Sequence, residues 1–163
     1  MAAVTHTLTL PAAMLKRGFW LYVWRVEGPA GEHLYVGRTG DNSSPNAKPP
    51  YQRMGQHLGH QKNQNALRKY LENRGIKPER CYAFHLVAHG PLFPQAVDMN
   101  AHKRPRDVVA ALEKALADAL TQVGYEVMNK VNSRMPLDRR RFAQVRRAFA
   151  VAFPNLRRRG KKR

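Results

Sequence analysis

The feature that most constrains this fold is a pair of short apolar segments separated by a tight turn. Phe19 to Val26 reads FWLYVWRV, a run of aromatic and β-branched residues that is typical of a strand. Glu27 to Glu32 is rich in Gly and Pro, which favour a turn. His33 to Arg38 (HLYVGR) predicts a second short strand. We therefore expect an antiparallel hairpin against which the rest of the chain must pack.

The remaining pattern predicts helices and one more strand. Arg80 to His89 alternates as a third strand, and residues 90–106 contain prolines and predict a loop. The clearest helix is expected to begin after Asp107, a good N-cap residue, and to end at Gly124. Shorter helices are expected over Ala12 to Lys16, Tyr51 to Leu58, Asn65 to Asn73 and Leu137 to Phe153. This order predicts an α+β fold (mixed α/β) with a small central three-stranded antiparallel sheet flanked by helices.

Charge indicates the kind of partner. The 163 residues include 29 Lys and Arg against 11 Asp and Glu, a net charge of +18, which favours a polyanion such as nucleic acid. Residues 134–163 alone carry a net charge of +11. The last helix would turn Arg140, Arg141 and Arg147 away from its apolar face. Together with Arg157, Arg158 and the basic tail that follows, these side chains are expected to bind phosphates; a tail that only aids solubility is the alternative.

Several other classes of protein are excluded. A single cysteine, Cys81, excludes a disulfide framework within the chain and a Cys-rich zinc module. The sequence contains neither a Gly-rich phosphate loop nor an H-E-x-x-H motif. Its longest apolar run, Phe19 to Trp24, is too short to span a bilayer, and its start does not resemble a signal peptide. We expect a cytoplasmic protein with no membrane partner; its oligomeric state stays open.

Two tripeptides in the hairpin, Trp20-Leu21-Tyr22 and Tyr35-Val36-Gly37, resemble the two signature motifs of the GIY-YIG nuclease family. Further matches follow in the same order as in that family: Arg38, Arg53 and His57 at i, i+4, Glu113 and Asn129. The resemblance covers residues 18–133. It implies a nuclease domain there, preceded by an extension with a short helix at residues 1–17. A basic C-terminal helix and a disordered Arg/Lys tail at residues 134–163 would follow.

The sequence departs from the family pattern at a few positions. Trp20 stands in place of a glycine, while Leu21 and Val36 stand in place of isoleucines. These are apolar strand positions, so the differences leave the chemistry intact. The loop before Arg53 is longer than usual, and Asn132 competes with Asn129 for the match.

The resemblance implies a metal-dependent endonuclease that hydrolyses phosphodiester bonds in DNA, or in RNA. Glu113 would hold one Mg²⁺ or Mn²⁺, because these ions accept oxygen ligands and retain several waters. Arg53 would bind the scissile phosphate through its planar guanidinium. Asn129 would orient groups around the metal.

The hairpin would supply the remaining groups. Tyr22 is expected to take the proton of the attacking water, with His57 passing the proton on. Tyr35 would orient the water or the phosphate, and the two tyrosines could exchange roles. Gly37 would let the backbone approach closely, and Arg38 would contact the substrate.

Plainer interpretations exist for the same residues. Tyr22 shares strand parity with Trp20 and Trp24, so it could be an ordinary core aromatic. Glu113 could be a solvated helix residue, although no basic residue lies three or four positions from it, which argues against a salt bridge. For the whole protein, the alternatives are a nucleic-acid-binding module on the same scaffold without turnover, and a basic ribosome-associated protein.

Overall fold

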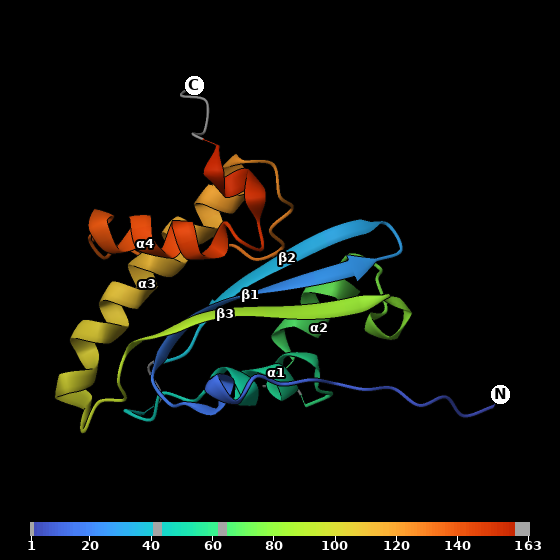
Figure 1. Ribbon diagram of the computed structural model, residues 1–163, viewed down its shortest axis with the longest axis horizontal. Helices are drawn as coiled ribbons and strands as arrows, with labels where there is room; N and C mark the ends of the chain where they lie inside the picture. The colour runs from blue at the N-terminus through green and yellow to red at the C-terminus, as the bar shows by residue number, and fades with distance from the viewer. Residues whose placement is uncertain (1, 41–43, 62–64, 159–163) are drawn as a thin grey trace.

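The computed structural model describes residues 2–40, 44–61 and 65–158. Within them, β1 (Phe19–Gly28), β2 (Gly31–Arg38) and β3 (Ala83–Phe93) form one antiparallel sheet in the order β2-β1-β3 (Figure 1). Helices cover the sheet, so the expected α+β class with a three-stranded antiparallel sheet is confirmed.

The hairpin is tighter than the sequence predicted. Pairing between β1 and β2 continues as far as Gly28 and Gly31, so only Pro29 and Ala30 form the turn. Gly31 has a φ of +123°, which glycine adopts easily. The longer pairing fixes the register that later places Tyr22 opposite Gly37.

The two faces of the sheet pack against different helices (Figure 1). On one face lie α3 (Met99–Gln122) and α4 (Arg139–Phe149), and on the other lie α1 (Pro50–Leu58) and α2 (Ala66–Glu72). Short 3₁₀ turns occupy Ala12–Leu15, Pro78–Arg80 and Pro154–Arg157. Because side chains alternate along a strand, β1 sends Phe19, Leu21 and Val23 toward α3 and α4, and Tyr22, Trp24 and Val26 toward α2.

The prediction of a loop over residues 90–106 was wrong. β3 continues to Phe93, and α3 already begins at Met99. Its N-cap is Asp98, whose side chain accepts a hydrogen bond from the Ala101 amide at 2.8 Å, and not Asp107. Pro105 lies inside the helix. The early turns are held by tertiary packing, since the ring of the fully buried His102 lies 4.9 Å from that of Phe19.

The last helix is shorter than predicted. α4 begins after Asp138, which caps the Arg141 amide at 3.0 Å, and ends at Phe149. Phe153 is fully buried although it lies beyond the end of the helix. The sequence prediction therefore continued the helix to Phe153, because its apolar spacing matches that of the helix. The first short helix, expected at Ala12 to Lys16, is a 3₁₀ turn.

The part of the chain that the structure describes contains no helix with the length and apolarity needed to cross a membrane. Arg157 and Arg158, which open the predicted basic tail, are exposed. Residues 159–163 of that tail lie outside the described residues.

Candidate nuclease site

The site is built where β1 begins and β2 ends. Tyr22 and Gly37 are partners in the strand register. A Cβ atom added at Gly37 would lie 2.5 Å from the Cε2, Cζ and Oη atoms of Tyr22, closer than real contacts allow. The second tripeptide therefore ends in glycine because the Tyr22 phenol occupies the space that a side chain would need.

Helix α1 places His57 against both tyrosines of the hairpin. His57 Nε2 lies 2.7 Å from Tyr22 Oη, and its ring centroid lies 5.0 Å from that of Tyr35. The side chain is buried, with 6% of its surface exposed. Burial, and secondly the charge of Arg53, lowers the pKa of His57 to about 4. At neutral pH the imidazole is therefore uncharged, and in the tautomer with the proton on Nδ1 its Nε2 accepts a hydrogen bond from the Tyr22 phenol.

Tyr35 has a different environment from Tyr22. Its ring lies between those of His57 and Tyr70, at centroid distances of 5.0 and 5.7 Å. Burial, together with the charge of Glu113, raises the pKa of Tyr35 to about 12. Tyr35 thus keeps its proton and is suited to donate a hydrogen bond rather than to act as a base. Tyr70, from α2, was not singled out from the sequence, because no spacing rule connects it to the hairpin.

Glu113 of α3 pairs with the last residue of β2. Arg38 Nε donates to Glu113 Oε2 at 2.9 Å, and the two side chains are 19% and 15% exposed. Burial raises the pKa of Glu113 to about 6, although Arg38 and Arg53 act to lower it. The expectation that Glu113 lacks a salt-bridge partner was wrong, because it considered only residues on the same helix.

Arg53 lies one helical turn before His57 on α1. Its positive charge acts to lower the pKa of both His57 and Glu113, so Arg53 lies close enough to influence both side chains. The fold therefore gathers most of the expected side chains from β1, β2, α1 and α3: Tyr22, Tyr35, Arg38, Arg53, His57 and Glu113.

Asn129 has a role other than the expected one. Its side chain accepts a hydrogen bond from the Val36 amide at 2.9 Å and donates one to the Val36 carbonyl at 2.7 Å. Nearby, Leu34 exchanges backbone hydrogen bonds with Glu126 and Met128 at 2.8 Å each. Both ends of the Asn129 amide are thus engaged with the outer edge of β2 rather than with groups around a metal. Asn129 positions the strand that carries Tyr35 and Gly37.

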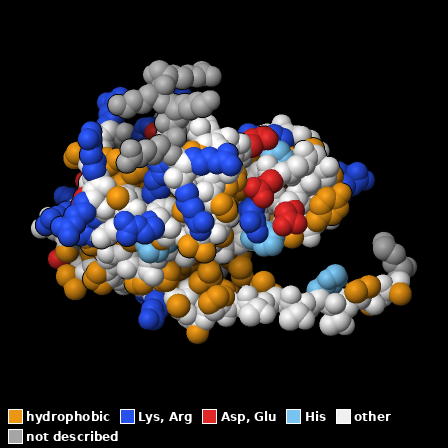
Figure 2. All heavy atoms as spheres, turned by 45° about the horizontal axis from the view of Figure 1, so that its top comes forward, with side chains coloured by type: hydrophobic (Ala, Val, Ile, Leu, Met, Phe, Trp, Pro, Cys, Tyr) orange, Lys and Arg blue, Asp and Glu red, His pale blue; other side chains and the backbone are white. Residues whose placement is uncertain are grey.

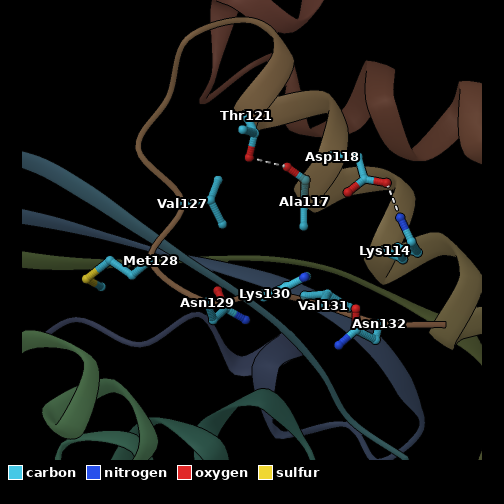
Figure 3. A pocket seen from close by; sticks show the side chains of 10 residues that line it. All are labelled: Lys114, Ala117, Asp118, Thr121, Val127, Met128, Asn129, Lys130, Val131 and Asn132. Atoms are coloured by element: carbon cyan, nitrogen blue, oxygen red, sulfur yellow. Dashed lines mark hydrogen bonds and ion pairs between the residues drawn. The ribbon is translucent and has the colours of Figure 1, made fainter. Parts of the chain in front are cut away.

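A hollow of about 290 Å³ lies between α3 and residues 127–132 (Figure 3). Its walls include Lys114, which follows Glu113 in the sequence and pairs with Asp118, together with Lys130. Neither tyrosine of the site lines it. We regard the hollow as a neighbouring basic surface and not as the reactive centre.

The basic residues of α4 lie on a separate surface. Lys and Arg side chains gather on the half of one face that overlies α3 and α4 (Figure 2). The exposed arginines of α4 and the residues after it include Arg140, Arg141, Arg147, Arg157 and Arg158. Among these, Arg141 also has partners within the protein, because its guanidinium stacks 4.7 Å from the centroid of the Phe93 ring and pairs with Asp138 at 3.3 Å.

Arg146 was not expected to have a role. Its side chain donates hydrogen bonds of 2.8 Å to the carbonyl oxygens of Leu156 and Arg158. These bonds fix the backbone that presents Arg157 and Arg158 beside α4.

A divalent cation would have few protein ligands in this site. Within residues 2–40, 44–61 and 65–158, no three His, Cys, Asp or Glu side chains gather as a metal-binding group. Glu113 is a hard oxygen donor of the kind that Mg²⁺ accepts alongside water and phosphate oxygens. Arg38 and Arg53 place positive charge beside Glu113 and would repel a divalent cation there. A bound anion would offset this charge, so the cation would bind more favourably together with an anion.

No family model, curated protein or solved structure matches this chain. A functional conclusion therefore rests on the geometry and chemistry of its own side chains.

Proposed function

We propose that this protein is a metal-dependent endonuclease of the GIY-YIG kind that hydrolyses phosphodiester bonds in DNA. The observation that carries the proposal is the 2.7 Å contact between Tyr22 and an uncharged His57, in a site that also contains Arg53 and Glu113. The site thus brings together a phenol in contact with an imidazole, a guanidinium and a carboxylate. Their combination is what phosphodiester hydrolysis requires.

In this mechanism, Tyr22 accepts a proton from the attacking water while its own phenolic proton passes to His57 Nε2. Arg53 binds the non-bridging oxygens of the scissile phosphate, and Arg38 assists it. Tyr35 stays protonated and donates a hydrogen bond to the water or to the phosphate. A Mg²⁺ or Mn²⁺ held by Glu113 would stabilise negative charge on the phosphate and on the leaving oxygen.

The basic surface of α4 supports the choice of a polyanionic substrate. Exposed arginines on α4 and after it give affinity that does not depend on sequence. RNA is the other polyanion that this surface fits, and parallel assays on DNA and RNA of the same sequence separate the two. A cytoplasmic location belongs to the same proposal.

The test is plasmid nicking in the presence of Mg²⁺. We expect cleavage by the wild type and a loss of at least about a hundredfold in Glu113→Gln, Arg53→Lys and Tyr22→Phe, the scale of removing one catalytic group. Asp118→Asn is the matched control, because Asp118 is also a paired carboxylate on α3 but lies on the hollow. Full activity in any of the first three variants contradicts the role given to that residue.

A nucleic-acid-binding module without turnover is the second candidate. The observation that favours it is the Arg38–Glu113 pair, which occupies the carboxylate that the reaction needs. Tight, salt-sensitive binding without metal-dependent cleavage would support this candidate over the nuclease.

A further inference from the structure

Arg38 is bound in a way that opposes its proposed contact with the substrate. Its Nε donates to Glu113 Oε2, and its Nη1 donates to the Gly40 carbonyl at 3.3 Å. A guanidinium carries five N–H donors, and here two of them point toward protein acceptors. The side chain therefore has to release Glu113, at least in part, before it binds a phosphate in a bidentate manner.

The charges at the site connect this release to metal binding. One carboxylate, Glu113, is influenced by two guanidinium groups, Arg38 and Arg53, so the cluster is already positive. A divalent cation placed there alone meets repulsion from both arginines and competition from Arg38 for Oε2. A phosphate removes both obstacles, because it supplies negative charge and an alternative partner for Arg38.

We infer that Arg38 exchanges Glu113 for a phosphate of the nucleic acid, so that the divalent metal and the nucleic acid bind cooperatively. This inference rests on the proposed function for the identity of the two ligands. It adds that the site assembles only on the substrate, and that free metal is bound weakly. The Arg38 guanidinium, which pairs with Glu113 in the free protein, binds a phosphate of the nucleic acid in the complex.

The backbone around Arg38 permits this exchange without a larger rearrangement. Thr39 is fully buried, and its hydroxyl donates to the Gly18 carbonyl at 2.7 Å. The same hydroxyl accepts a hydrogen bond from the Trp20 amide at 2.9 Å. Because the backbone is anchored directly after Arg38, the exchange involves the Arg38 side chain and not the strand.

The experiment measures Mn²⁺ affinity by the electron paramagnetic resonance signal of free Mn²⁺, with and without a 12-base-pair duplex. Tyr22→Phe serves as the parent protein, because it is expected to be unable to cleave the duplex. The same titration with Glu113→Gln added measures the Mn²⁺ that the DNA itself binds. We expect the duplex to tighten Mn²⁺ binding at Glu113 by about tenfold or more, within the usual range of coupling between sites.

Arg38→Gln tests the exchange itself. Without the competing cation, Mn²⁺ should bind about tenfold more tightly in the absence of DNA, and the effect of the duplex should fall below about threefold. Arg25→Gln is the matched control, since Arg25 is also a sheet arginine near a glutamate, at 3.9 Å from Glu32. This control should retain the full coupling. Thermal melting of each variant checks that it is folded.

The outcomes separate this inference from the proposed function. Equal Mn²⁺ affinity with and without the duplex overturns the exchange, even if the wild type cleaves DNA. Coupling that persists unchanged in Arg38→Gln also overturns it. Coupling that is lost in Arg38→Gln supports the exchange, even if the wild type proves unable to cleave, in which case only the proposed catalysis fails. Mn²⁺ titrations that Glu113→Gln leaves unchanged overturn both the exchange and the metal site.

Discussion

His57 is uncharged in the folded protein but would titrate normally in the unfolded chain. Its folded-state pKa of about 4 lies below the ordinary value of 6.5, so protons bind more tightly to the unfolded chain between these values. The wild type should therefore lose about 3 kcal/mol of unfolding free energy as pH falls from 7 to 4, relative to His57→Gln. Urea unfolding of both proteins across this range measures the difference.

Glu113 changes the pH dependence of the unfolding free energy in the opposite direction between pH 6 and 4.5. Its pKa of about 6 lies above the ordinary 4.5, so the folded state gains stability as pH falls through 6 toward 4.5. Both proteins contain Glu113, so this contribution cancels in the comparison. His85→Gln, at a partly exposed histidine that pairs with Glu27, is the control for removing a histidine; because it retains His57, it should keep the loss that His57 causes. Parallel curves for wild type and His57→Gln would contradict the burial of a neutral imidazole.

Some of the site's residue contacts could be predicted from the sequence, and others could not. The pairing of two short strands across a tight turn, with Arg53 and His57 one helical turn apart, is local information that spacing rules contain. The Arg38–Glu113 pair is not local, because 75 positions separate its members. No periodicity connects such residues, so only the folded chain reveals that Glu113 is already paired.

At the level of elements, the order of strands and helices was predicted correctly, but the prediction began α3 too late and continued α4 too far. Pro105 was interpreted as part of a loop, since proline removes a helical hydrogen bond. The packing of a 24-residue helix against the sheet outweighs that local preference. The true cap, Asp98, is followed by MNAHKRPR, which lacks the apolar spacing that identified the later part of the helix.

The outer edge of β2 depends on Asn129. Replacing it with alanine removes both hydrogen bonds to Val36 and leaves a strand amide and carbonyl without these partners. We expect Asn129→Ala to lower the unfolding free energy by about 1–3 kcal/mol. Urea unfolding measures the loss, and hydrogen exchange of the Val36 amide should become faster. Asn132→Ala, at an exposed position, is the control; equal effects of the two variants would argue against this role.

On the scale of the whole molecule, the most basic surface and the cluster of Tyr22, Tyr35 and His57 lie in different regions. The last 30 residues carry a net charge of +11, and α4 is attached to the core through Val145 and Phe149. The tyrosines and His57 lie on the opposite face of the sheet, against α1 and α2. A nucleic acid that contacts both regions must pass around an edge of the sheet. Glu113, on α3 beside Arg38, connects the two faces, because its charge acts on Tyr35 and is itself influenced by Arg53 of α1.

The exposed arginines of α4 should therefore determine affinity for nucleic acid. In a duplex-binding assay, each phosphate contact contributes about 0.9 to the slope of log affinity against log salt. If Arg140 and Arg147 each contact one phosphate, the double variant Arg140→Gln/Arg147→Gln should reduce that slope by about 1.8. Arg141→Gln is the matched control on the same helix, because Arg141 stacks on Phe93 and pairs with Asp138. It should lower the melting temperature and leave the slope unchanged; a slope that falls only in Arg141→Gln would show that the duplex contacts a different face of α4.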